Sequence, residues 1–213
     1  MDLFQVTPPA SEPVTLSVVK LQCRVSYDFE DELFTDWIQG AREMLENELK
    51  RSFIDTVWRM DLDNFPPYPS RLGDRWSDYY LERVDLGSWG QIPFPKARVT
   101  SLASISYTDM TGSRQTLDPS LYLFQPGDFA RVTPAYGHSW PTTRWQAGSV
   151  QITFTAGYGA DASYVPSCIK GAIRLLVAYQ NENREAALIG NTGQELPIGI
   201  RRLIASENWG AGF

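Results

Sequence analysis

The residues that could perform chemistry in this chain are few and widely spaced. His138 is the only histidine, and it lies in a Gly/Pro-rich stretch with no nucleophile elbow nearby, so a catalytic triad is not indicated. Cys23 and Cys168 are the only cysteines, and their separation in apolar helical contexts predicts two buried thiols. One histidine and two distant cysteines leave no zinc ligand set. We therefore expect no enzyme activity, no cofactor and no metal.

A glycine pair offers one formal motif. Gly157, Gly159 and Ala162 match the dinucleotide fingerprint G-x-G-x-x-A after a predicted strand. That motif needs a helix that opens on the glycines, so that its amides meet a pyrophosphate. Here Val165-Pro166 places the helix start several residues later, and no other β-α unit follows. A turn between a strand and a helix is the favoured interpretation.

Acidic and aromatic residues alternate in Asp74-Arg75-Trp76-Ser77-Asp78-Tyr79-Tyr80. Sugar rings stack on aromatic faces, and glycoside hydrolysis uses two carboxylates, so a carbohydrate-binding or glycoside-hydrolysing domain is an alternative function. The sequence does not place two carboxylates opposite each other. An aromatic interface loop is the favoured interpretation.

Composition bounds the remaining choices. The 213 residues are 43% hydrophobic and 13% aromatic, with a net charge of −6, which argues against a phosphate-binding surface. No apolar run reaches the roughly 18 to 20 residues that cross a bilayer, and the N-terminus lacks the pattern of a signal peptide. We expect a soluble protein made in a cytoplasm, with no membrane partner.

Two long helices and two short ones are predicted. Asp28–Arg51 begins with acidic residues and ends with basic ones, which complements the helix dipole. Its apolar residues lie along one face: Leu33, Trp37, Ala41, Met44, Leu45 and Leu49. The second long helix starts at Pro166 and is apolar almost all round until residues 180–185. Short helices are predicted over Thr15–Val25 and Ile198–Glu207.

Between the long helices, several segments alternate as half-buried strands do. They are Ile54–Leu62, a hairpin from Val99–Tyr107 to Arg114–Leu117 through a turn at Gly112, and the strands Leu121–Gln125, Phe129–Thr133 and Val150–Thr155. The expected class is α+β: a small helical bundle of two long and two short helices with an inserted antiparallel β-rich region. Its expected parts are a bundle of 14–53 and 165–208, a β-region of 54–157 with an aromatic loop at 66–95, an N-terminal arm at 1–13 and a C-terminal tail at 205–213. The arm is expected to be extended and unstructured unless a partner holds it.

The order of these elements carries a family resemblance. The helix EDELFTDWIQGAREMLENELKRSFI, the strand VWRMDLDNFP, the stretch IPFPKARVTSLASISYTDMTGSRQTLDPSLYLF, the segment VQITFTAGYGADASYVPSCIKGAIRLLVAYQNENREA and the closing LPIGIRRLI resemble the head-tail connector (adaptor) family of long-tailed bacteriophages. The resemblance covers most of residues 14–208. It implies a structural virion protein of the neck, assembled in the host cytoplasm. There it would form a homo-oligomeric ring, typically of twelve subunits, between the portal of the DNA-filled head and the tail.

The resemblance also implies partners and surfaces. The partners are the portal protein, a tail-side connector or tail protein, and DNA that passes through the channel without specific binding. The expected portal-docking residues lie in the C-terminal segment and are Ile200, Arg201, Arg202, Leu203, Ile204, Trp209 and Phe213. The alternative is that this segment folds back on the chain's own helical bundle. This chain departs from the family by a longer aromatic insertion at about Pro67–Gly90. We expect that insertion to contact a neighbouring subunit or the tail through Trp76, Tyr79, Tyr80 and Trp89.

Overall fold

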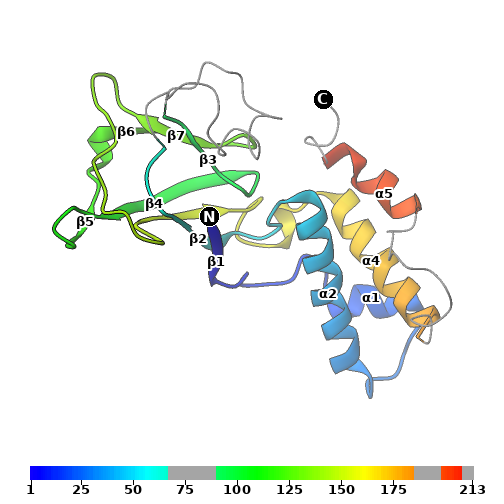
Figure 1. The fold of residues 1–213 in the computed structure, drawn as a ribbon. Coiled ribbons are helices and arrows are strands. Elements are labelled where there is room, and N and C mark those ends of the chain that lie inside the picture. The colour runs from blue at the N-terminus through cyan, green and yellow to red at the C-terminus, as the bar shows by residue number, and fades with distance from the viewer. Residues whose placement is uncertain (67–89, 185–197, 208–213) are drawn as a thin grey trace. The chain divides into compact units, whose positions relative to one another are not determined.

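The computed structural model describes residues 1–66, 90–184 and 198–207, and it divides the chain into two compact units (Figure 1). One unit joins Met1–Pro8 to Thr56–Ala156 and holds the strands. The other joins Pro9–Asp55 to Gly157–Phe213 and holds the helices. This combination of helices with antiparallel sheets confirms the α+β class.

The helical unit contains two long helices and two short ones among the described residues, as predicted. They are α1 (Leu16–Cys23), α2 (Asp31–Leu49), α4 (Ser167–Glu182) and α5 (Ile198–Ile204), and α5 continues into a 3-10 turn at Ala205–Glu207.

Local sequence explains where the two long helices begin and end. Asp31 and Glu32 lie in the first turn of α2, where carboxylates favour the positive end of the helix dipole. The helix ends earlier than predicted, because Lys50 adopts the left-handed conformation (φ 51°) and its N–H meets the carbonyls of Asn47 and Glu46. Pro166 is the N-cap of α4 rather than its first residue.

The long helices share one apolar core, which confirms that they pack together. Most of the buried face of α2 is the predicted one, since Ala41, Leu45 and Leu49 are buried. In the first turns it differs by one position, because Phe34 and Ile38 are buried whereas Leu33 is exposed. On α4 the buried residues recur at the predicted helical spacing. The core of this unit consists of Val14, Val19, Phe34, Ile38, Ala41, Leu45, Leu49, Phe53, Ile54, Val165, Ile169, Ala172, Ile173, Leu176, Val177, Ile200 and Ile204.

Among its described residues, the β unit contains a five-stranded and a three-stranded antiparallel sheet. The order in the larger sheet is β1-β2-β8-β4-β5, and the order in the smaller is β3-β7-β6. The strands are β1 (Asp2–Thr7), β2 (Thr56–Leu62), β3 (Ile92–Pro93), β4 (Val99–Thr108), β5 (Arg114–Thr116), β6 (Tyr122–Gln125), β7 (Arg131–Pro134) and β8 (Val150–Ala156).

The centre of the larger sheet is β8, which pairs with β2 on one side and β4 on the other. Ile152 and Phe154 alternate with polar residues and are fully buried. The ring of Phe94 packs edge-on against Phe154, with 4.8 Å between the ring centroids. The alternation in the sequence therefore predicts this strand correctly.

The N-terminus is a strand of the chain's own sheet, whereas an arm unstructured without a partner is expected from the sequence. Residues 2–7 form β1, which pairs antiparallel with β2, for example Leu3 with Met60. Without β1, β2 would be an edge strand whose backbone N–H and C=O groups had no partners on that side. The strand ends before Pro8 and Pro9, since proline cannot donate to a ladder.

Candidate functional site

The C-terminal segment, predicted to dock on the portal, packs on its own bundle in this structure. Ile200 and Ile204 point into the helical core and are buried beside α4. Arg201, Arg202 and Leu203 are exposed. Residues 198–207 thus adopt the folded-back alternative that the sequence left open.

Polar contacts hold the end of this segment as well. The Tyr158 hydroxyl donates a hydrogen bond of 2.5 Å to Glu207, and the Cys168 thiol lies 3.8 Å from the other carboxylate oxygen of Glu207. Arg51 approaches the same Tyr158 hydroxyl at 3.5 Å. The 3-10 turn after α5 therefore contacts Tyr158, which precedes α4, and Cys168 in the first turn of α4.

This arrangement divides the predicted docking residues into two sets. The first set is Ile200 and Ile204, which are buried in the core of the helical unit and pack against other residues of the same chain. The outward set is Arg201, Arg202 and Leu203. Trp209 and Phe213 lie outside the described residues, as do Trp76, Tyr79, Tyr80 and Trp89 of the insertion.

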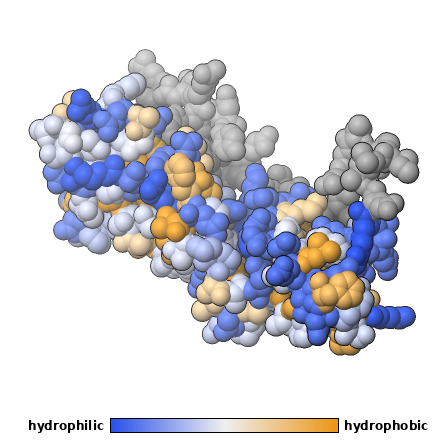
Figure 2. Space-filling model, turned by 90° about the horizontal axis from the view of Figure 1, so that it is seen from below, coloured by the Kyte–Doolittle hydropathy of each residue, from blue (hydrophilic) through white to orange (hydrophobic). Residues whose placement is uncertain are grey.

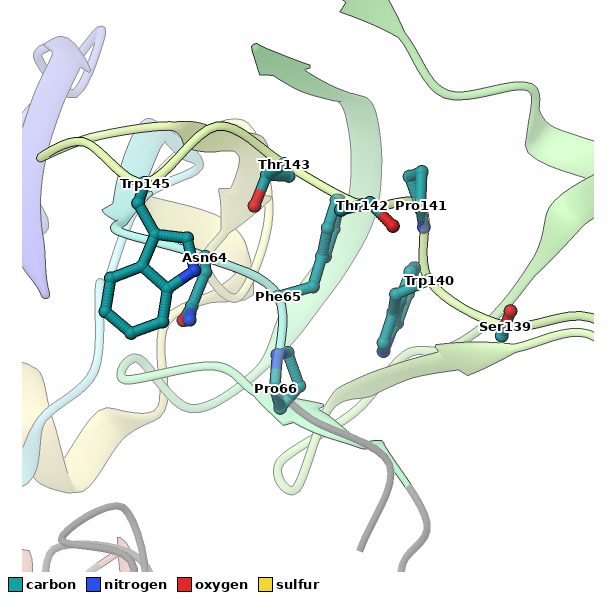
Figure 3. Close-up of a pocket in the computed structure, with 9 residues that line it drawn as sticks. All are labelled: Asn64, Phe65, Pro66, Ser139, Trp140, Pro141, Thr142, Thr143 and Trp145. Atoms are coloured by element: carbon teal, nitrogen blue, oxygen red, sulfur yellow. The ribbon is translucent and has the colours of Figure 1, made fainter. Parts of the chain in front are cut away.

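The β unit has an aromatic pocket of about 240 Å³ (Figure 3). Phe65 and Trp140 stack with centroids 4.8 Å apart and ring planes 4° from parallel. The Trp140 indole N–H donates a 2.6 Å hydrogen bond to the Gly90 carbonyl, which fixes the ring. Trp145 lies on the other side of Phe65 in this view, and its side chain is 89% exposed. The lining residues are Asn64, Phe65, Pro66, Ser139, Trp140, Pro141, Thr142, Thr143 and Trp145.

The chemistry of this lining is aromatic and neutral. Its polar side-chain groups are one amide, several hydroxyls and two indole N–H groups, and none of the nine lining residues is an aspartate, a glutamate or a histidine. Glycoside hydrolysis uses a pair of carboxylates across the scissile bond. The pocket can therefore offer stacking and hydrogen bonds, but its lining does not supply that pair.

The other chemical candidates are in structural positions. His138 is exposed in a turn, where its backbone N–H donates to the Ala135 carbonyl. Cys23 and Cys168 are free thiols and half-buried, which is less burial than predicted. Across residues 1–66, 90–184 and 198–207, no group of three or more His, Cys, Asp or Glu residues is placed to hold a metal ion. No helix in those ranges is long and apolar enough to cross a bilayer.

The Gly157–Gly159 turn allows close backbone contact and does not form a nucleotide loop. A Cβ at Gly157 would lie 2.6 Å from both the Cα and the backbone N of Asp55. Asp55 N–H donates to the Gly159 carbonyl and Tyr158 N–H to the Phe53 carbonyl, so the turn binds the segment after α2. The helix opens only at Ser167, after a 3-10 turn at Ala162–Tyr164.

Charged side chains fix the helical unit at two points. Arg42 is buried and donates to Glu12 (2.8 Å) and Glu46 (3.0 Å). Burial would lower the pKa of Arg42, but the carboxylates of Glu12 and Glu46 outweigh it and raise that pKa. At the other point Arg184 makes a two-pronged contact with Glu30 at 2.7 and 2.8 Å, which lowers the pKa of Glu30 to about 2.

The surface also carries exposed apolar side chains, seen among hydrophilic ones in Figure 2. Among the described residues of the helical unit, the most exposed of these are Leu21 and Phe29, and Phe29 stacks on Tyr27 with centroids 4.3 Å apart. On the β unit Phe129 and Tyr136 are exposed in addition to Trp145. Exposed aromatic groups of this kind are typical of surfaces that contact other proteins.

Comparison with known families gives a match over the first part of the chain. The family described as "Phage gp6-like head-tail connector protein" matches residues 13–75, which include α1, α2 and β2. This match confirms, over those residues, the connector resemblance seen in the sequence. No curated protein matches the chain in sequence.

Solved structures match over nearly the whole chain. A chain from the neck of an empty gene transfer agent (GTA) particle, computed with C6 symmetry, is 20% identical, with a TM-score of 0.72 over 97% of this chain and 95% of that one. A chain from the virion of the native GTA particle is 21% identical, with a TM-score of 0.68. A chain from the native neck, computed with C12 symmetry, is 22% identical, with a TM-score of 0.62. Each of these two matches covers 97% of this chain and 94% of the other. The fold is thus the fold of these neck and virion chains.

Two features of the structure are not predicted from the sequence, and a third is an alternative that the sequence leaves open. The Trp140–Phe65 stack joins residues 75 positions apart, and no local pattern announces such a pair. The sheet position of residues 2–7 had a weak signal, namely apolar residues ending at Pro8-Pro9. The burial of Ile200 and Ile204 had a clearer one, since a short apolar face needs a partner and α4 is apolar almost all round.

Proposed function

We propose that this chain is a structural subunit of a phage-type neck, a head-tail connector that forms a ring between the portal and the tail. The observation that carries the proposal is the agreement of two comparisons: the connector family matches residues 13–75, and the fold matches GTA neck chains over 97% of the chain. Twelve subunits per ring is the number we propose, in line with the C12 symmetry of one of those necks. The subunit acts in the virion neck and assembles in the host cytoplasm.

The role is one of contact and not of catalysis. A head-tail connector has a structural role that requires no enzyme activity. The residues that could perform chemistry in the described part of the chain are a neutral aromatic pocket, one histidine and two separate thiols. Exposed aromatic groups and a net charge of −6 suit a subunit that meets other proteins while DNA passes.

The portal is the proposed partner of the C-terminal segment. The outward residues Arg202 and Leu203, together with the chain beyond residue 207, form the proposed docking surface. Arg202 supplies charge for complementarity and Leu203 supplies apolar area. The insertion with Trp76, Tyr79, Tyr80 and Trp89 is proposed to contact a neighbouring copy or the tail-side partner.

Mass measurement tests the proposal directly. The purified chain is studied by light scattering alone and after mixing with the portal of its own particle. A ring gives a species many times the 24.0 kDa of one chain that co-migrates with the portal. A chain that stays at 24.0 kDa and does not bind the portal contradicts the proposal.

A further inference from the structure

The strand β1 forms an edge of the larger sheet and contributes little to the core of its unit. None of its six residues is buried; Leu3 is half-buried, and Phe4 and Val6 are 45% and 54% exposed. Its pairing with β2 is irregular between Gln5 and Thr7. Besides this ladder, Leu3 packs on the core and the Arg59 guanidinium lies 4.8 Å from the centre of the Phe4 ring.

A long stretch of chain separates β1 from its partner β2. After Pro8 the backbone leaves the β unit, builds α1 and α2 in the helical unit, and returns only at Thr56. By contrast, β4 and β5 form a hairpin whose turn, Asp109–Ser113, forces them to pair within one chain. No turn forces β1 onto the β2 of the same molecule.

The edge of β2 nevertheless requires a strand with the sequence of β1. Without a strand beside it, β2 would present a row of unpaired backbone groups, and the fully buried Met60 would lose its cover from Leu3. The same ladder, with the same Leu3 and Phe4 interactions, is available from the β1 of any second copy. Such an exchange of an identical element costs little, because every interaction of β1 with β2 forms again between the two copies.

We infer that β1 is exchanged when copies of this chain assemble, so that Asp2–Thr7 of one copy pairs with β2 of the next. Each copy then donates one strand and accepts one, a head-to-tail arrangement that closes into a ring under rotational symmetry. Neighbours in a ring present β1 at high effective concentration, which favours the exchange. The inference depends on the proposed function for the presence of that neighbouring copy.

A disulfide trap distinguishes the two pairings. Phe4 and Arg59 lie directly opposite each other in the ladder, where cysteines can bridge. The variant Phe4→Cys/Arg59→Cys is made in the full chain with Cys23→Ala and Cys168→Ala, assembled alone or with the portal, and oxidised. The matched control is Ser106→Cys/Thr116→Cys in the β4–β5 hairpin, which bridges within one chain in every assembly state.

Exchange predicts a ladder of covalent multimers from the Phe4/Arg59 variant on a non-reducing denaturing gel, while the hairpin control runs as a single chain. If species of ring mass yield only single chains with an internal bridge, the exchange is overturned and the proposed function stands. If no species heavier than one chain forms, alone or with the portal, the proposed function is overturned together with the exchange.

Discussion

Gly157 lacks room for a side chain. A Cβ there would lie 2.6 Å from the backbone of Asp55, and backbone atoms cannot swing aside as the end of a long side chain can. We expect Gly157→Ala to lower the free energy of unfolding by about 1 to 3 kcal/mol, the usual cost of overpacking. Chemical denaturation of the purified chain measures this decrease.

Gly40 provides the matched control. It is exposed on α2, and a Cβ there would meet no atom within 4 Å. Alanine is favoured over glycine inside a helix by up to about 1 kcal/mol, so Gly40→Ala is expected to stabilise the chain. Equal effects from the two substitutions would show that the close approach to Asp55 is unimportant.

Leu176 and Leu175 are adjacent in sequence and opposite in environment. Leu176 is 5% exposed within the helical core, whereas Leu175 is 41% exposed. Truncating a buried leucine costs about 2 to 5 kcal/mol, so Leu176→Ala is expected to lower the free energy of unfolding by that amount. Leu175→Ala is expected to change stability by about 0.5 kcal/mol or less. Thermal and denaturant unfolding compare them, and similar decreases would refute the central place of α4.

These two leucines also show what sequence could predict. The helical spacing of Ile169, Ile173 and Leu176 is a local signal, and it correctly assigns the buried face of α4. On α2 the same reasoning correctly assigns Leu45 and Leu49, but it misses by one position in the first turns, because an apolar Leu33 beside Phe34 leaves the direction of the face ambiguous there. Which of two adjacent apolar residues is buried depends on the neighbouring helix, and periodicity alone does not identify that neighbour.

At the scale of elements, the Glu30–Arg184 ion pair joins the start of α2 to the chain just after α4. The pKa of Glu30 is about 2 in the folded chain, below its ordinary value of 4.5. A lowered pKa means that the ion pair stabilises the fold above about pH 4.5 and that this contribution disappears as the pH falls toward 2.

Glu30→Gln is therefore expected to lower the melting temperature at pH 7 and to differ progressively less from the parent chain between pH 4.5 and 2. Melting curves across that range test the expectation. Asp36→Asn, on an exposed position of α2, serves as the control. A difference between Glu30→Gln and the parent that stays constant down to pH 2 would contradict the role of the ion pair.

The C-terminal segment shows why a short element is hard to place from sequence. The spacing of Ile200, Leu203 and Ile204 predicts a short apolar face. It does not say whether that face packs on the chain's own bundle or on a partner. The structure buries Ile200 and Ile204 and leaves Leu203 outward. Long-range packing decided the question, and no local pattern contains that information.

This division yields a prediction for portal binding. Arg202→Glu with Leu203→Ser changes only exposed side chains, so the melting temperature is expected to stay within a few degrees of the parent chain. Binding to the portal is expected to fall at least tenfold, since the variant removes both charge complementarity and apolar area. Ile204→Ala, a core substitution, should lower stability instead. Unchanged portal affinity in the Arg202/Leu203 variant would remove this surface from the proposal.

At the scale of the whole molecule, the proposed ring combines many copies of an acidic chain around a passage for DNA. Each copy has 25 acidic and 19 basic residues, a net charge of −6. Lys and Arg on the channel wall would bind phosphates and release counterions, which would retard a moving duplex in a salt-dependent way. A net acidic or neutral wall avoids that retardation.

We therefore expect the assembled ring, isolated at its full mass, not to retain duplex DNA even at low salt. A labelled duplex is followed by gel mobility at about 50 and 200 mM salt, with the single chain as control for charge outside the channel. Binding by phosphate contacts would appear as an affinity that falls steeply, by a factor of about 10³ or more, between the two salt concentrations. Such a fall for the ring but not for the single chain would place basic residues on the channel wall. Equal lack of binding by both supports a wall along which DNA slides without being held.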